Sequence, residues 1–346
     1  MAAINRAVAP TSTNQLSDWY AGTCLPLLTG FTPTTFSPQN FWNNTKLSSR
    51  DIENMEDLIL EKMIATYQID TTHIIYDATN FFTYIDTMQK CETAKRGHCK
   101  AKRNDLRVVG LSLMVTSDCN IPLLHETYPG NRPDAKEFRR MMEQLKVRYE
   151  RISRKPADVT VVFDRGNNSE DNINYLKSGE FPLHYVGGLK KNQVKDLYQV
   201  SREHYVPLKG ESLKNQSAYR TMMDVYGSNC TVLIVHNPEL ENGQLQGIAL
   251  NQDKATKKLL ELQESLMRRA IGEVKKGRAP TQESITAAVE KILKPEYMKG
   301  IFKYEILEKE DKLYLTFAPS EEALEQIRIT HLGKTALFTD RHDFTN

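Results

Sequence analysis

Two stretches decide how the middle of this chain folds: "THIIYDATNFF" at residues 72–82 and "TVVFDRGNNS" at residues 160–169. Each begins with apolar and β-branched residues, a pattern that favours a buried strand. Each run then stops at a single aspartate, Asp77 in the first and Asp164 in the second. A carboxylate at the end of a buried strand is costly unless something binds it. The sequence therefore raises the question of what these two aspartates hold.

The functional interpretation is that the two aspartates bind a divalent cation. Two carboxylates at one rim of a sheet repel each other unless a cation lies between them. Mg²⁺ is commonly held by one or two carboxylates together with substrate phosphates, and a pair of such ions can assist cleavage of a phosphodiester. We therefore expect Asp77 and Asp164 to bind Mg²⁺ or Mn²⁺. The structural alternative is that each aspartate only forms a turn or caps a helix, the more common role of a single strand-terminal aspartate.

Composition places the chain among ordinary soluble proteins. Its 346 residues are enough for about two domains, and 40% apolar and 26% charged residues are typical of a globular protein. No run of 18 apolar residues is present, and the N-terminal "MAAINRAVAP" lacks the features of a secretory signal. The five cysteines are odd in number and irregularly spaced, which favours reduced thiols. These features predict a cytoplasmic protein.

Positive charge is concentrated in one part of the chain. Residues 90–155 hold 16 Lys and Arg against 8 Asp and Glu, although the net charge of the whole chain is only +2. Such a block is what a phosphate-contacting surface needs, but it is also compatible with a solvated, lysine-rich helix face. The candidate DNA-binding residues are those of the "KRGHCKAKR" segment and two that follow the second aspartate: Lys95, Arg96, His98, Lys100, Lys102, Arg103, Arg165 and Asn167. The last two can position a DNA strand or merely cap the next helix.

The order of patterns predicts an α/β sheet. Strands are expected at 73–77, on both sides of a turn at 116–120, at 159–164 and at 182–190, with helices at 138–152 and 169–178. Three strands, a helix, a strand, a helix and a strand make a mixed sheet. Further on we expect a hairpin at 226–250 with "ENGQ" as its turn, helices at 254–276 and 281–293, a hairpin at 301–319 and a last strand at 334–340.

Several motifs resemble those of a known family, in order and in spacing. "YDATNFF" at 76–82, "RGHCKAKRNDLRVVGLSLMVTSDCNIPLLHETYPGNRPD" at 96–134, "VVFDRGNNSEDNI" at 161–173 and "GKTALFTDRHDFT" at 333–345 are similar to segments of bacterial insertion-sequence DDE transposases. This resemblance implies an RNase H-like core: a mixed five-stranded sheet with flanking helices, interrupted by an inserted α+β subdomain. The implied boundaries are a helical segment at 1–70, the core at 71–190, the insertion at 191–330 and a returning core strand at 331–346.

The resemblance also implies a function. Asp77 and Asp164 match the first two metal-binding, catalytic aspartates of the family, and the partners are DNA at the element ends and target DNA, with a possible homodimer and no membrane. The third family carboxylate, a helix-borne Glu after the returning strand, has no match, so we expect the chain to stop before it. The implied activity is metal-dependent DNA cleavage and strand transfer during transposition. Without the third carboxylate, we expect this chain alone to bind the metal weakly and to cleave DNA little or not at all. The alternatives are a non-catalytic DNA-binding remnant and a structure-specific nuclease of the same fold.

Overall fold

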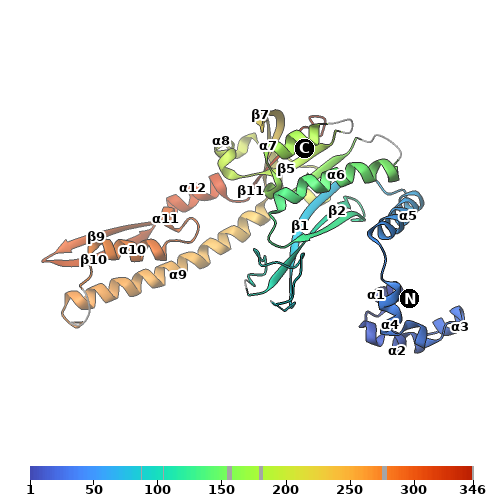
Figure 1. The fold of residues 1–346 in the computed structure, drawn as a ribbon. Coiled ribbons are helices and arrows are strands. Elements are labelled where there is room, and N and C mark those ends of the chain that lie inside the picture. The colour runs from blue at the N-terminus through green and yellow to red at the C-terminus, as the bar shows by residue number, and fades with distance from the viewer. Residues whose placement is uncertain (87, 104, 154–157, 179–181, 275–278, 345–346) are drawn as a thin grey trace. The chain divides into compact units, whose positions relative to one another are not determined.

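The computed structural model describes residues 1–86, 88–103, 105–153, 158–178, 182–274 and 279–344 (Figure 1). The chain divides into two compact units. One comprises Met1–Ile69 with Val147–Lys155, and the other comprises Asp70–Lys146 with Pro156–Asn346. Among the described residues, no helix combines the length and the apolar character that a membrane crossing requires.

The first unit is helical. Its helices are α1 (Ala2–Val8), α2 (Leu16–Ala21), α3 (Leu25–Thr29), α4 (Pro38–Asn44) and α5 (Ser49–Tyr67). The longest, α5, begins with a reciprocal cap: the Ser48 hydroxyl accepts from the Asp51 N–H at 3.2 Å, and the Asp51 carboxylate accepts from the Ser48 N–H at 3.2 Å. Arg148 of this unit is buried and pairs with Glu56 and Asp57, both at 2.8 Å.

The second unit is built on one large sheet. Its nine strands are β1 (His73–Thr83), β2 (Arg107–Thr116), β3 (Pro122–Pro129), β4 (Thr160–Phe163), β5 (His184–Leu189), β6 (Val206–Pro207), β7 (Ser217–Val225), β8 (Ser228–His236) and β11 (Lys334–Thr339). They follow the order β3-β2-β1-β4-β5-β11-β8-β7-β6. Strands β3, β2 and β1 are antiparallel neighbours, whereas β1, β4 and β5 are parallel. These first five strands have the RNase H-like order and direction, as expected.

Helix α6 (Asp134–Ser153) covers one face of the first strands. Phe138 of this helix packs edge-on against Tyr76 of β1 and Phe163 of β4, with ring centroids 5.2 and 4.9 Å apart. The neighbouring apolar residues on the same helical stripe, Met141, Met142 and Leu145, are also fully buried. The short helix α7 (Glu170–Lys177) follows β4 and leads to β5. The core of the sheet therefore lies on the side of Tyr76 and Phe163.

A second, elongated body follows β8. Its elements are α9 (Pro238–Ala270), α10 (Gln282–Ile292), α11 (Met298–Ile301), β9 (Phe302–Lys309), β10 (Lys312–Pro319) and α12 (Glu321–His331), and the four-residue helix α8 (Lys195–Tyr198) precedes it. Strands β9 and β10 form a two-stranded hairpin of their own, as predicted. In Figure 1 the hairpin, α10 and α11 lie along α9, and a separate apolar cluster that includes Leu259, Val289 and Leu315 holds them together.

The hairpin predicted at 226–250 is wrong. Its first half is β8, but β8 pairs with the preceding strand β7, and "ENGQ" lies inside α9. The Asn237 side chain caps α9 by accepting from the Glu239 and Leu240 N–H groups, and Pro238 occupies the first turn. Both are helix-start signals, and together they outweigh the turn tendency of Asn-Gly. Because β7, β8 and β11 continue the sheet of β1–β5 within one unit, the domain boundaries at 190 and 330 stay a prediction.

A buried carboxylate joins the sheet to the elongated body. Glu241, in the first turn of α9, is 4% exposed. It accepts from Arg328 of α12 at 2.6 Å and from Arg202 at 2.9 Å, and it contacts Nε2 of His236 at 2.5 Å. Burial alone raises the pKa of Glu241, but the hydrogen bonds from Arg328 and His236 and the charge of Arg202 leave that pKa below its usual value. The carboxylate is therefore charged at neutral pH and holds together the segments that carry His236, Arg202 and Arg328.

We expect Glu241→Gln to destabilise the protein by about 3 kcal/mol. This is the low end for breaking a buried ion pair, because Arg202 and Arg328 keep contact with water. Since the pKa of Glu241 is lowered in the folded protein, its contribution is present at neutral pH and is lost as pH falls through that lowered value. Urea unfolding from pH 7 down to pH 3 measures both effects. Glu239→Gln, an exposed change in the same helical turn, should leave the free energy of unfolding nearly unchanged.

Candidate functional site

The two aspartates occupy neighbouring positions on adjacent parallel strands. The last pair in the β1–β4 ladder is Tyr76 with Phe163. The next residue after Tyr76 is Asp77, within β1, and the next after Phe163 is Asp164, just past the end of β4. Adjacent strands lie about 4.8 Å apart. Because side chains alternate along a strand and the two aromatic residues face Phe138 of α6, the aspartates face the opposite side. Both are exposed.

Each carboxylate accepts one hydrogen bond from the backbone beside it. Asp77 accepts from the Ala78 N–H and Asp164 from the Arg165 N–H, both at 2.8 Å. Neither has an ion-pair partner in the described part of the chain, and no group of three His, Cys, Asp or Glu side chains there is placed to hold a metal ion. Two hard oxygen donors with free lone pairs nevertheless fit Mg²⁺ or Mn²⁺, because Mg²⁺ keeps several waters and accepts phosphate oxygens.

The basic segment is fixed to the sheet at its start. It lies in the connection between β1 and β2, where the main chain of Lys95 pairs with Val108 of β2 through N–H···O contacts of 3.1 and 2.7 Å. Gly97 packs against the backbone of Gly130, and a Cβ at position 97 would lie 2.0 Å from the Gly130 carbonyl oxygen. Only glycine allows this approach. The segment therefore follows a defined path over the first strands.

Further contacts bring the segment to the acidic pair. The Asn80 side chain donates to the His98 carbonyl at 3.0 Å and accepts from the Lys100 N–H at 3.2 Å. The Lys100 ammonium donates to the carbonyl of Ala78 at 2.6 Å, and Ala78 is the residue after Asp77. Asn80 thus positions the basic segment, and Lys100 carries a positive charge at the residue that follows the first aspartate.

Not every predicted cation is equally available to DNA. The side chains of Lys95, Arg96, His98 and Lys102 are exposed. Arg103 already forms a bidentate ion pair with Asp105, in which two guanidinium nitrogens lie 2.8 and 2.6 Å from the carboxylate oxygens. This pair raises the pKa of the Arg103 guanidinium. The guanidinium also lies over the ring of Phe82.

The residues after the second aspartate have different placements. Arg165 is exposed, whereas the side chain of Asn167 is 4% exposed and cannot reach a phosphate in this conformation. The Asn167 N–H instead donates to the Asp164 carbonyl at 3.0 Å, and its own carbonyl accepts from Asn172 at 2.8 Å. In this conformation Asn167 lies within the turn after Asp164, which fits the capping alternative, and its DNA contact stays a prediction. The burial follows from the 3-10 turn at 165–167, which points this side chain inward.

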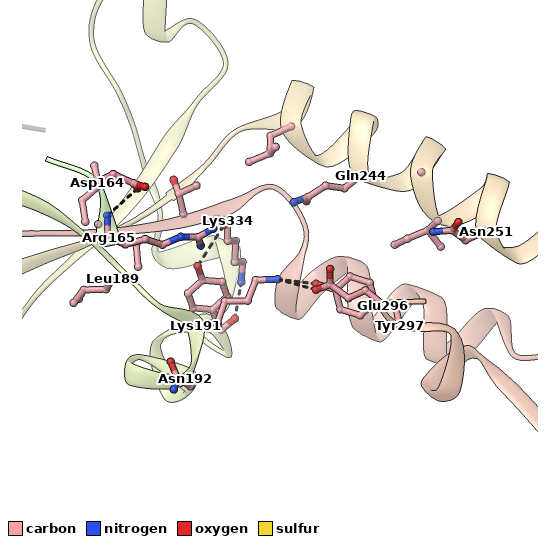
Figure 2. Close-up of a pocket in the computed structure, with 18 residues that line it drawn as sticks. Asp164, Arg165, Leu189, Lys191, Asn192, Gln244, Asn251, Glu296, Tyr297 and Lys334 are labelled. Atoms are coloured by element: carbon pink, nitrogen blue, oxygen red, sulfur yellow. Dashed lines mark hydrogen bonds and ion pairs between the residues drawn. The ribbon is translucent and has the colours of Figure 1, made fainter. Parts of the chain in front are cut away.

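A cleft of about 800 Å³ begins at Asp164 and extends toward α9 and α11 (Figure 2). Asp164, Arg165 and Lys334 line it from the strand side, and Gln244 and Asn251 line it from α9. Lys191 reaches across to the Tyr297 hydroxyl at 2.6 Å and lies 4.0 Å from Glu296. Lys191 and Lys334 were not singled out by the sequence, because the segments that form the cleft are far apart in the chain.

Lys334 is a buried cation in this cleft. Its side chain is 3% exposed, and its ammonium donates to the Tyr198 carbonyl at 2.6 Å. Burial, reinforced by the charge of Arg202 and partly offset by Glu241, lowers the pKa of Lys334 to about 8. An anion that enters the cleft would favour its charged form.

We expect Lys334 to titrate well below an ordinary lysine, which does so near pH 10.4. The pH dependence of amine labelling, followed for each lysine by mass spectrometry, should place its midpoint near 8. The free energy of unfolding should change with pH in the direction that this lowered pKa requires. Since the folded-state pKa is lowered, the wild-type chain should gain stability relative to Lys334→Met as pH rises from about 8 toward 10.4, and lose it as pH falls through about 8. A midpoint near 10 would contradict the burial of this charge.

The sequence matches no protein-family model, and a comparison with curated proteins finds no match. Among solved structures, the chain is similar to piggyBac transposase in a synaptic complex with hairpin DNA, with 12% identity over 66% of this chain and 45% of that one and a TM-score of 0.36. It is also similar to Mos1 transposase in a paired-end complex with the left transposon end, with 12% identity over 50% of this chain and 59% of that one and a TM-score of 0.24. A Mos1 mariner paired-end complex with Mn matches at 12% identity, over 52% and 56% of the two chains, with a TM-score of 0.22.

Each match spans less than two thirds of the other chain, and each matched protein is a transposase. At this identity and with TM-scores below 0.5, the likeness concerns the fold alone. Any function must be argued from this chain's own topology and residues.

Proposed function

We propose that this chain carries the catalytic core of a DDE-type DNA transposase, in which Asp77 and Asp164 bind Mg²⁺ or Mn²⁺. The observation that supports this most directly is the register of β1 and β4, which puts the two aspartates side by side on the face away from α6. The Mos1 mariner paired-end complex has been solved with Mn and with Mg. The substrates are DNA at the element ends and target DNA, and a homodimer is the assembly that we expect on them.

Each part of the site has a task in this proposal. A divalent cation bound there would activate water and stabilise charge on a leaving phosphodiester oxygen. Asp77 and Asp164 present free carboxylate oxygens to it, while Lys100 holds the β1–β2 connection against the strand beside them. Arg96 and Lys102 contact phosphates outside the centre. Arg165 and Lys191 guide the strand along the cleft that starts at Asp164.

One observation favours a second candidate function. Within the described residues, no third carboxylate or histidine joins Asp77 and Asp164 in a group that could hold a metal ion. A non-catalytic DNA-binding remnant of a transposase needs no such group. A structure-specific nuclease of the same fold needs metal and cleavage but no strand transfer. The first of the experiments that follow separates these possibilities.

Metal binding should depend on both aspartates. Mn²⁺ at several times its dissociation constant should stabilise the wild-type chain by about 1 kcal/mol, as binding to the folded state alone requires. Asp77→Asn and Asp164→Asn should each remove most of this gain and should abolish any metal-dependent nicking of a labelled element-end duplex. In metal-free buffer the same changes should stabilise the protein slightly, by up to about 1 kcal/mol, because like charges on adjacent strands repel. Thermal melts and a gel assay measure these effects.

Glu308→Gln, on the exposed surface of β9, is the matched control and should keep the full effect of Mn²⁺. Metal binding without any nicking by the wild-type chain would favour the remnant. Nicking without joining of the freed 3′ end to target DNA would favour the nuclease. An unchanged response to Mn²⁺ in both aspartate variants would rule out the proposed centre.

DNA affinity should depend on the exposed cations of the β1–β2 connection. Changing Arg96 and Lys102 together to Ala should weaken binding regardless of DNA sequence and lower the slope of log affinity against log salt by about 2, close to one unit for each phosphate contact. Adding Lys100→Ala and Arg103→Ala should weaken binding further, but by less per residue, because Arg103 is already paired with Asp105. Fluorescence anisotropy over a salt series gives both quantities.

The control pair is Lys303→Ala with Lys309→Ala, two exposed lysines of β9. This variant loses the same formal charge and should leave the salt slope unchanged. Equal slopes for the two double variants would mean that the connection between β1 and β2 does not contact DNA.

A further inference from the structure

Helix α9 has two faces of different character. One face is buried in the core of the elongated body through Ile248, Ala255, Leu259, Leu266 and Ala270. The opposite face carries large apolar side chains in water: Leu250 is 60% exposed, Leu260 51%, Met267 57% and Ile271, just after the helix, 61%. These residues lie on one stripe, because positions 250, 253, 257, 260, 264, 267 and 271 follow each other at steps of three and four. We call them the α9 stripe.

Charge is unevenly distributed along the same face. Three exposed lysines precede Leu260, namely Lys254, Lys257 and Lys258, and two exposed glutamates follow it, Glu261 and Glu264. The exceptions are Asp253 in the first half, and Arg268 and the half-buried Arg269 in the second. A helix face that contacts only water does not require its lysines in one half and its glutamates in the other.

An antiparallel pairing of two copies satisfies part of this pattern, although it sets Met267 of one copy opposite Lys254 of the other. If a two-fold axis lies between positions 260 and 261, Lys257 of one copy faces Glu264 of the other. Asp253 then faces Arg268, which also pairs with Glu273 of its own chain at 3.0 Å. The same axis places Leu250 opposite Ile271 at both ends and brings the two Leu260 side chains together. A parallel pairing would instead put lysine against lysine. Such an interface uses one patch twice, as two-fold dimers do.

We propose that the α9 stripe is a dimerisation surface whose partner is a second copy of this chain, bound antiparallel. From Leu250 to Ile271 the contact is about 32 Å long at 1.5 Å per residue. Apolar contacts at the centre and both ends provide affinity, and the charge pairs between them fix the direction and the register. This inference rests on α9 alone and does not depend on the catalytic role of Asp77 and Asp164.

The first test uses the oligomeric state of the full chain without DNA. Sedimentation velocity over a concentration series should show a monomer–dimer equilibrium for the wild type. Leu260→Glu should raise the dimer dissociation constant by at least about tenfold, because two carboxylates would meet at the axis. Ile329→Glu, an equally apolar and exposed site on α12, should leave the constant unchanged. A wild-type chain that stays monomeric, or a dimer that tolerates Leu260→Glu, would overturn the proposal.

The second test uses charge reversal. Lys257→Glu and Glu264→Lys should each weaken the dimer roughly tenfold, because each creates two like-charge contacts and removes two favourable ones. Mixing the two singly changed chains should restore dimers, since both contacts in the mixed pair are then complementary. Energy transfer between chains labelled separately, with helix content checked by circular dichroism, detects the mixed pair. A change that only altered the helix itself would not be rescued by mixing, so absence of mixed dimers would also overturn the proposal.

Discussion

The parallel pairing of β1 with β4 is the constraint on which the rest of the candidate site depends. Its register is fixed by packing on one face, where Tyr76 and Phe163 both meet Phe138 of α6. A slip of one residue in either strand would turn an aromatic ring into water and a carboxylate into the core. The same apolar contacts that stabilise the sheet therefore force Asp77 and Asp164 to its other face, side by side. The repulsion between these carboxylates is tolerated because both are exposed to water.

The first five strands and α6 were predictable because apolar residues recur in each of them with the period of a strand or a helix. The buried residues of the structure lie at these apolar positions. The stretch from 226 to 250 was not predictable in this way. Its Asn-Gly dipeptide is a hairpin signal, yet it lies in a helix whose start is encoded by Asn237 and Pro238. A local turn tendency has to compete with a well-capped helix that buries one face over 33 residues, and burial of that length contributes far more. Strand β7 was missed because its burial pattern is irregular.

The candidate site also has a part that the sequence predicts and a part that it does not. Asp77 and Asp164 were predictable because each ends an apolar run, and a parallel sheet brings such ends together. The sequence of a loop does not show which of its side chains are buried. Asn167 was therefore expected to be available to DNA, although the turn at 165–167 points its side chain inward. Nor does sequence spacing reveal that Asp105 already pairs with Arg103. Lys191 and Lys334 escaped notice because the cleft joins segments more than 100 residues apart, and only the folded chain brings them to Asp164.

The difference in length between β1 and β4 explains why acidic and basic groups meet here. Strand β4 ends at Phe163, whereas β1 continues to Thr83. Beyond Tyr76, β1 therefore has no β4 neighbour, and its polar groups need other partners, because unpaired backbone groups are costly. The chain supplies these partners from the basic connection: Lys100 donates to the Ala78 carbonyl, and Asn80 holds the backbone of His98 and Lys100. Satisfying one uncovered stretch of backbone thus anchors one cation, Lys100, at the residue that follows Asp77.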